Sequence, residues 1–95
     1  MAKGLRFEWD AKKAEINLSK HGISFEEAAT VFGDSLAITI VDEQHSYELE
    51  SREITIGSTV KHRIVVVSHT DRMGNIRIIS ARKAVKSEIK QYNEA

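Results

Sequence analysis

Apolar residues in the first third of the chain recur with the spacing of an α-helix. Two amphipathic stretches show it, with apolar positions Ala11, Ala14 and Leu18 in the first and Phe25, Ala28, Ala29 and Phe32 in the second. Asp10 can cap the first helix, which should run to His21, and Gly22 suits the left-handed position that ends a helix. A short strand, Leu5–Glu8, is expected before it.

The second helix bears on function. Ser24 and Glu27 form a capping box at its start, and Gly33 ends it. Two helices joined by a short turn are also the frame of a DNA-reading helix-turn-helix, whose second helix needs donors for base edges. This helix carries Glu26 and Glu27 but no Arg, Lys, Asn or Gln. We therefore expect the helix pair to cover a sheet. The residues expected to make that contact are Trp9, Leu18, Phe25 and Phe32.

After the second helix the apolar period changes to two, which is typical of strands. Four strands are expected, over Leu36–Val41, Arg52–Ile56, Arg63–Val67 and Asn75–Arg82. A Gly-containing loop, Asp71–Asn75, should join the last two as a hairpin. A helix over Ala84–Tyr92 closes the chain. Short links between these elements favour an α+β fold, with an antiparallel sheet of about four to five strands and the helices packed on one face. One domain is expected over residues 1–95.

The net charge of zero hides an uneven distribution. Residues 1–50 carry 5 Lys and Arg against 10 Asp and Glu, whereas residues 51–95 carry 9 against 4. The net +5 of the second half is suited to a phosphate ligand, although an ordinary solvated basic face explains it equally well.

Five basic residues lie on or beside the predicted strands, namely Arg52, Arg63, Arg77, Arg82 and Lys83. In an antiparallel hairpin the start of one strand lies beside the end of the next, so Arg52, Arg63 and Arg82 are expected to converge at one sheet edge. Guanidinium groups bind two phosphate oxygens at once and can stabilise the charge of a pentacoordinate transition state. Ordinary salt bridges to neighbouring glutamates are the competing interpretation.

A ribonuclease can use the 2′-hydroxyl of RNA as its nucleophile and needs a base beside such cations. Glu88 can serve if its surroundings raise its pKa, and His62 or His69 are alternatives. Each also has a plain structural interpretation: a surface carboxylate for Glu88 and a solvated or packed ring for the histidines. Tyr92 can stack on a base, or pack the last helix onto the sheet.

The sequence shows no pattern for a metal or cofactor. The histidines, His21, His45, His62 and His69, lack paired ligand spacing, and no nucleotide-binding or serine-hydrolase motif occurs. There is no cysteine, no apolar run near the roughly 20 residues of a membrane span, and no secretory signal before the first strand. A cytoplasmic chain without a cofactor or metal, and without contact with a membrane, is expected.

The segments "FEWD", "KHGISFEEA" and "VFGD", followed by "SREITIG", "RIVVVSHT" and "IRIISARKA", resemble the BrnT family of type II toxin–antitoxin systems. The resemblance runs from about Phe7 to Tyr92. One departure is Ala11, where the family often has proline after "WD". Proline there only pre-forms the first helical turn, so this difference leaves the chemistry untouched.

The resemblance implies a small fold similar to the RelE ribonuclease toxins, with metal-independent cleavage of RNA that halts translation. It also implies a BrnA-like antitoxin with a ribbon-helix-helix part, and a complex that binds its own promoter DNA through that antitoxin. On the positions that match, the expected catalytic residues are Arg52, Arg63, Arg82 and Glu88. The expected RNA contacts are Arg77, Lys83, Tyr92 and His69.

Two other functions compete with a toxin endoribonuclease. The chain can be a non-catalytic partner subunit of a ribbon-helix-helix repressor complex, or an inactive remnant of a toxin. A ribonuclease needs a convergent basic cleft that is open in the free protein. A partner subunit needs only a surface that binds its partner.

Overall fold

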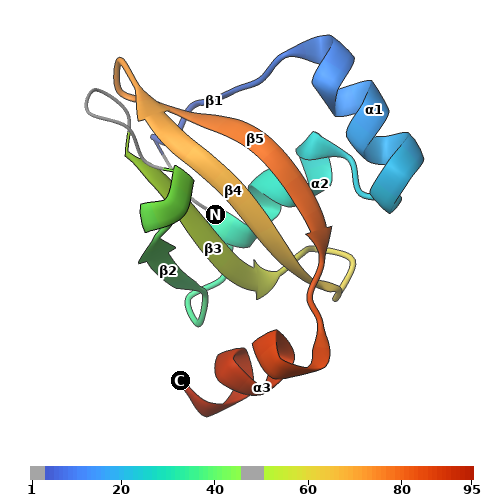
Figure 1. Cartoon of the computed structure of the whole chain (residues 1–95), viewed down its shortest axis with the longest axis vertical. Helices are drawn as coiled ribbons and strands as arrows, with labels where there is room; N and C mark the ends of the chain where they lie inside the picture. Colours follow the sequence, from blue (N-terminus) through green and yellow to red (C-terminus); the bar gives the residue numbers. More distant parts are fainter. Residues whose placement is uncertain (1–3, 46–50) are drawn as a thin grey trace.

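The computed structural model describes residues 4–45 and 51–95, in which five strands form one sheet in the order β1-β5-β4-β3-β2 (Figure 1). The strands are β1 Phe7–Glu8, β2 Ile38–Val41, β3 Arg52–Ser58, β4 Ile64–Arg72 and β5 Asn75–Lys83. The helices are α1 Ala11–His21, α2 Phe25–Ala29 and α3 Lys86–Glu94, with short 3-10 helices η1 Thr30–Gly33 and η2 Glu43–His45. The α+β class predicted from the sequence is confirmed.

The sheet is mixed, which corrects the antiparallel prediction. Strands β2 to β5 are antiparallel neighbours, but β1 runs parallel to β5, with Phe7 paired to Ile76 and Glu8 to Arg77. The chain leaves β1 through two helices and returns to the sheet at its opposite edge, at β2. Sequence periodicity marks β1 as extended, but it carries no information about which distant strand β1 joins.

The predicted helix caps are present. The Asp10 carboxylate accepts a hydrogen bond from the Lys13 amide at 2.9 Å, and Ser24 Oγ accepts one from the Glu27 amide at 3.0 Å. Gly22 ends α1 with φ of 70°, and its amide donates to the Leu18 carbonyl at 2.8 Å. The second predicted helix is divided, because its last turn is the 3-10 helix η1.

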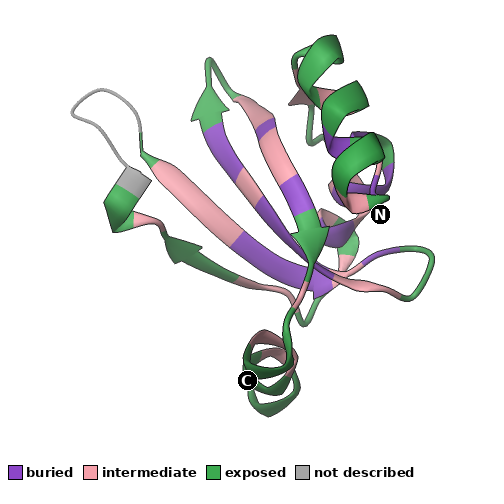
Figure 2. Ribbon diagram, turned by 45° about the vertical axis from the view of Figure 1, so that its right-hand side comes forward, coloured by how far each residue is buried: buried purple, intermediate pink, exposed green. Residues whose placement is uncertain are grey.

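The helices do not all cover one face, contrary to expectation. Helices α1 and α2 pack on one face of the sheet, whereas α3 lies at one end of it and contacts β3 (Figures 1 and 2). The covered face holds the core. Its buried side chains are Ile23, Phe25, Ala28, Val31, Val65, Val67, Ile78 and Ala81. We call the opposite face the open face.

Of the four residues predicted to join helices to sheet, Phe25 is fully buried, and Trp9 and Phe32 pack against the core. The prediction for Leu18 was wrong, since this residue is 50% exposed. The buried residue on α1 is Asn17. Its side-chain Nδ2 donates to the carbonyls of Ala81 and Ile23, each at 2.9 Å. Its amide oxygen accepts from the Ala81 N–H at 3.1 Å.

The Asn17 amide therefore pairs with the edge of β5 as a neighbouring strand would. Unsatisfied backbone groups are costly when buried, so this pairing turns α1 until Asn17 faces the sheet. Leu18, the next residue on the helix, then points to solvent.

The β4–β5 hairpin is tighter than predicted. Its turn has two residues, Met73 and Gly74, with φ of 52° and 84°. Positive φ at both positions is the signature of a type I′ turn, whose twist matches that of the strands. Strand β4 consequently extends to Arg72, beyond its predicted end at Val67.

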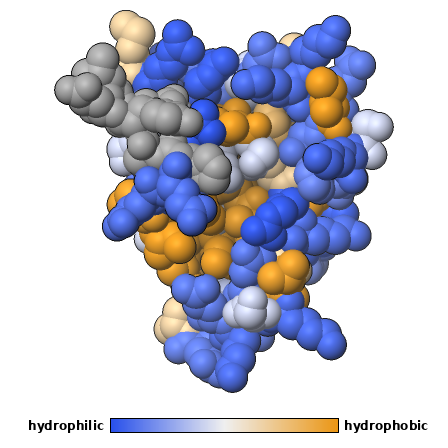
Figure 3. All heavy atoms as spheres, viewed as in Figure 1, coloured by the Kyte–Doolittle hydropathy of each residue, from blue (hydrophilic) through white to orange (hydrophobic). Residues whose placement is uncertain are grey.

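The open face is apolar in its middle. The cross-strand register places Ile40 beside Ile54, Ile38 beside Ile56, and Ile56 beside Val66 on that face. Figure 3 shows hydrophobic side chains gathered over the middle of the sheet, with hydrophilic ones around them.

Candidate functional site

Three of the predicted arginines share the open face. Arg52 pairs across β3 and β4 with Thr70, which in turn pairs with Arg77 on β5. Arg82 pairs with Val66, and Val66 with Ile56. Residues paired directly across antiparallel strands point to the same side, so Arg52, Arg77 and Arg82 project from one surface.

The strand geometry sets their spacing. Arg52 and Arg77 are two strands apart, which separates their backbones by about 10 Å. Arg77 and Arg82 lie at opposite ends of β5, about 16 Å apart along the strand. Three cations thus border an apolar and hydroxyl-bearing surface, as an extended polyanion requires, but they do not converge on one atom.

Arg63 lies on the other side of the sheet. It comes two residues before the core residue Val65, so it points to the face that α1 and α2 cover. Its Nε donates to Glu27 Oε2 at 2.9 Å, its Nη2 also donates to Glu27 Oε1, and Nη2 donates to the Gly22 carbonyl at 3.1 Å. The guanidinium of Arg63 therefore ties the start of β4 to α2.

The expected convergence of Arg63 and Arg82 is wrong for a definite reason. The start of β4 does lie beside the end of β5, as the bond from the Ala84 amide to the Ile64 carbonyl shows. Side chains alternate along a strand, however, and a difference of one position reverses the face. The backbones therefore lie close together as predicted, while the two side chains point to opposite faces of the sheet.

Arg82 forms a two-pronged ion pair with Glu88. Its Nη1 donates to Oε1 at 2.8 Å and its Nη2 to Oε2 at 2.9 Å. The pair joins the end of β5 to the first turn of α3, and both side chains stay partly exposed. The amide of Val85 also donates to Glu88 Oε1 at 2.8 Å.

The hydrogen bonds from Arg82 hold the pKa of Glu88 below its ordinary value, against a smaller opposing effect of burial and with help from the Val85 amide. The condition set for Glu88 as a base, a raised pKa, is not met while Arg82 is bound to it. The same contact raises the pKa of Arg82. The Glu88 carboxylate thus occupies both Nη groups of the Arg82 guanidinium.

Arg77 is paired with Glu8 of the neighbouring strand β1, at 2.7 Å between Nη1 and Oε2. The side-chain Nδ2 of Asn75 donates to the other oxygen of Glu8 at 3.1 Å. Hydrogen bonds from Asn75 and Arg77 hold the pKa of Glu8 below its usual value. This acid sits among cations at the far end of the open face.

Tyr92 anchors α3. Its hydroxyl donates to Asp34 Oδ2 at 2.7 Å, and the same oxygen accepts from the Ser58 amide at 2.8 Å. Burial alone would raise the pKa of Asp34, but the hydrogen bonds from Ser58, Tyr92 and Leu36 outweigh it and lower the pKa. The bond to Asp34 raises the pKa of the Tyr92 phenol. Tyr92 therefore packs the last helix, with its hydroxyl engaged.

His69 is not placed to contact RNA. It is 4% exposed on the covered face, where its ring meets Phe32 edge-on and its Nε2 lies 2.7 Å from Thr55 Oγ1. Burial lowers its pKa. Lys83 is exposed and pairs with Val65, so it points to the covered side of the sheet at the end of β5. His62 is exposed in the β3–β4 loop.

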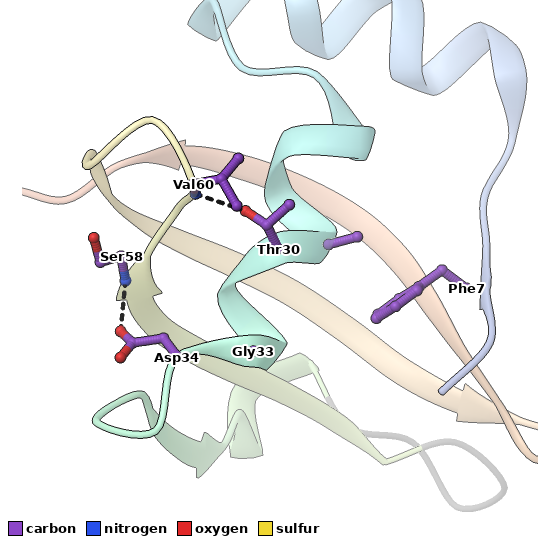
Figure 4. A pocket seen from close by; sticks show the side chains of 7 residues that line it. Phe7, Thr30, Gly33, Asp34, Ser58 and Val60 are labelled. Carbon is purple, nitrogen blue, oxygen red and sulfur yellow. Dashed lines mark hydrogen bonds between the residues drawn. The ribbon is translucent and has the colours of Figure 1, made fainter. Parts of the chain in front are cut away.

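A cavity of about 660 Å³ lies on the covered side, between η1, β1 and the β3–β4 loop (Figure 4). It is lined by Phe7, Ala29, Thr30, Gly33, Asp34, Ser58 and Val60. Asp34 already accepts bonds from Ser58, Leu36 and Tyr92, and Thr30 accepts one from the Val60 amide at 3.0 Å. The polar groups of this cavity are occupied by the fold, which favours the open face as the functional site.

Sequence reasoning missed three acids that fix candidate side chains: Glu8 pairs with Arg77, Glu27 pairs with Arg63, and Asp34 accepts from the Tyr92 hydroxyl. Glu27 carried a signal, the capping box, which pointed to the wrong partner for its carboxylate. Glu8 and Arg77 are 69 positions apart, and no local pattern connects them. In the described part of the chain, no group of three His, Asp or Glu side chains gathers as metal ligands.

The comparisons with known proteins agree with this fold. Residues 9–88 match the family model described as "Ribonuclease toxin, BrnT, of type II toxin-antitoxin system". The crystal structure of the Brucella abortus ribonuclease toxin BrnT is similar, with a TM-score of 0.65 and 21% identity over 86% of this chain and 99% of that one. No curated protein matches. No helix of the described residues is long and apolar enough to cross a bilayer. Because the family model spans most of the sequence, the chain belongs to the BrnT family of ribonuclease toxins of type II toxin–antitoxin systems.

Proposed function

We propose that this member is a metal-independent endoribonuclease that cleaves RNA and thereby halts translation, with Arg82 and Glu88 at its reactive centre. The observation that carries the proposal is the two-pronged Arg82–Glu88 pair at the border of the open face. A phosphodiester offers two oxygens in the same arrangement as a carboxylate, so it can replace Glu88 on the guanidinium.

That replacement changes both groups. Glu88 loses the contact that chiefly lowers its pKa, so it becomes a better proton acceptor beside the bound phosphate. It then takes the proton of the 2′-hydroxyl as that oxygen attacks phosphorus. The bond from phosphorus to the 5′-oxygen breaks, and the departing oxygen takes a proton from water. Arg82 stabilises the charge that gathers on the phosphate oxygens.

Arg52 and Arg77 lie too far from Arg82 to act on the same phosphate. We assign Arg52 and Arg77 to neighbouring phosphates of the RNA, where cations add affinity without base selectivity. Lys83 points to the covered side of the sheet, so we do not assign it to RNA bound on the open face. The ring of Tyr92 is half-buried and remains a candidate for stacking on a base. Arg63 and His69 have structural roles: Arg63 pairs with Glu27, and His69 is hydrogen-bonded to Thr55.

The type II toxin–antitoxin system to which the family belongs includes a protein antitoxin. We propose that it is BrnA-like, that it covers the basic residues of the open face, and that the complex binds promoter DNA through the ribbon-helix-helix part of the antitoxin.

The test is RNA cleavage by purified variants. Arg82→Ala should lower the cleavage rate by about 10²–10³-fold, the usual effect of removing a group that stabilises the transition state. It should change the free energy of unfolding by less than about 1 kcal/mol, because the ion pair is partly exposed. Glu88→Gln should also slow cleavage. Lys90→Ala, an exposed change on the same helix, is the control.

Full cleavage by Arg82→Ala would refute the proposed centre. Wild-type protein that leaves RNA intact but strengthens promoter binding by the antitoxin would instead support the non-catalytic partner subunit.

A further inference from the structure

We propose that the outer edge of β2 binds an extended segment of the antitoxin, with Lys or Arg at its ends, as a sixth strand of the sheet. The inference rests on the proposed function only for the identity of the partner. It does not require the chain to cleave RNA.

The backbone of β2 leaves donors and acceptors on its outer side. The Asp42 amide donates to the Arg52 carbonyl at 2.8 Å, which fixes the alternation along the pair of strands. Ile38 and Ile40 therefore bond inward to β3, and the backbone groups of Thr39 and Val41 point outward. No strand among residues 4–45 and 51–95 pairs with this side, because β2 ends the strand order.

The two edges of the sheet differ in how they are protected. At the other edge, β1 covers the first part of β5, and the Asn17 amide satisfies Ala81 further along. Natural proteins shield edges in this way, or with lysine, proline or a bulge. Strand β2, "ITIV", contains none of these residues.

The side chains around this edge are apolar and exposed. Leu36 is 67% exposed, Ile40 43% and Val41 54%, and they lie within six positions of one another. An added strand would place alternate side chains beside Ile40 on the open face and beside Val41 on the other. It would remove apolar surface from water on both faces while its backbone satisfied Thr39 and Val41.

Charge selects the partner. No lysine or arginine stands between Lys20 and Arg52 in the sequence, whereas Asp34 precedes β2 and Glu43 follows it. A second copy of the chain, paired edge to edge, would bring the same acids together, and like charges across a sheet are unfavourable. A segment with basic ends complements them, and the family provides one protein partner, the antitoxin.

Amide hydrogen exchange, followed residue by residue by NMR with the purified antitoxin as the probe, tests the inference. In the free chain the amides of Thr39 and Val41 should exchange fast, while those of Ile38 and Ile40 are protected by β3 and serve as internal references. Saturating antitoxin should slow exchange at Thr39 and Val41 at least about tenfold, as burial in a strand pair does.

A substitution separates backbone pairing from side-chain contact. Val41→Pro removes an outward N–H without removing a bond to β3, and should raise the Kd for the antitoxin about tenfold. Val41→Thr keeps the N–H and the branched shape, and should raise it less than about threefold. Protection at Ile40 in each variant reports whether β2 is still paired with β3.

Three results would overturn the inference: no antitoxin binding, binding without protection at Thr39 and Val41, or protection in the free chain that grows with protein concentration. The last would identify a second copy as the occupant. RNA cleavage by the free chain, measured on the same preparation before antitoxin is added, keeps the two proposals apart. Protection with no cleavage supports the docking edge and refutes the ribonuclease, whereas cleavage with no protection does the reverse.

Discussion

Replacing Glu27 by glutamine should destabilise the protein far more than its place in a capping box suggests. The capping bond itself, from the Glu27 amide to Ser24, survives the change. The carboxylate, however, is buried and holds the Nε and Nη2 groups of Arg63 as well as the Thr59 hydroxyl, which donates at 2.8 Å. Glutamine keeps the shape but removes the charge that compensates Arg63.

Breaking a buried ion pair by removing one partner costs about 3–5 kcal/mol, because the remaining charge is left uncompensated. Arg63 is partly exposed and keeps its bond to the Gly22 carbonyl, so we expect the lower end, about 3 kcal/mol. For a domain of this size that corresponds to a fall in Tm of about 12–24 °C. Most small domains have only about 5–15 kcal/mol of stability in total.

Urea unfolding at neutral pH, followed by circular dichroism, measures the effect. Glu26→Gln is the matched control: Glu26 is the exposed neighbour on the same helix, and its change should stay within about 0.5 kcal/mol. The double change Glu27→Leu with Arg63→Met should recover most of the loss, because it removes both charges together. A loss below about 1 kcal/mol for Glu27→Gln would refute the reasoning.

Three further predictions concern stability. Burial lowers the pKa of His69 below its ordinary 6.5, so stability that is complete above that pH should be lost as pH falls toward the folded pKa, and His69→Leu should flatten this dependence in urea titrations. Gly57→Ala should cost about 1–3 kcal/mol in thermal unfolding, since a Cβ there would lie 3.1 Å from those of Ala37 and Val31; an unchanged Tm would show that η1 can move away. Met73→Asn should raise stability by about 0.5–1 kcal/mol because asparagine tolerates the positive φ of this exposed turn position, and a lower Tm would contradict that account.

The elements could be predicted wherever the signal was local. Asp10, Gly22 and Ser24 act within one turn of their own positions, and each occupies the predicted cap. Leu18 failed because the orientation of α1 depends on Asn17 bonding to Ala81, 64 positions away. Periodicity alone cannot show that a polar residue will be preferred at the buried position of a helix.

The candidate site was predictable in composition but not in geometry. Arg52, Arg77 and Arg82 lie on strands, as predicted. The face to which each arginine points depends on the alternation of side chains along its strand. Only the full register of the sheet determines that alternation. The partner of Arg63 was hidden because the helix-start position already explained Glu27 locally, whereas its carboxylate pairs with Arg63, 36 positions away.

The parallel pairing of β1 with β5 also governs when the protein can fold during its synthesis. Phe7 pairs with Ile76, and Asn17 bonds to Ala81, 64 positions later, so these two segments meet their partners in the sheet only after β5 has been synthesised. Contacts between such distant positions close slowly, because the loop entropy is lost before the contact energy is gained. The nascent toxin therefore stays without its completed sheet until β5 has left the ribosome. During that interval an antitoxin already present in the cell has time to meet it.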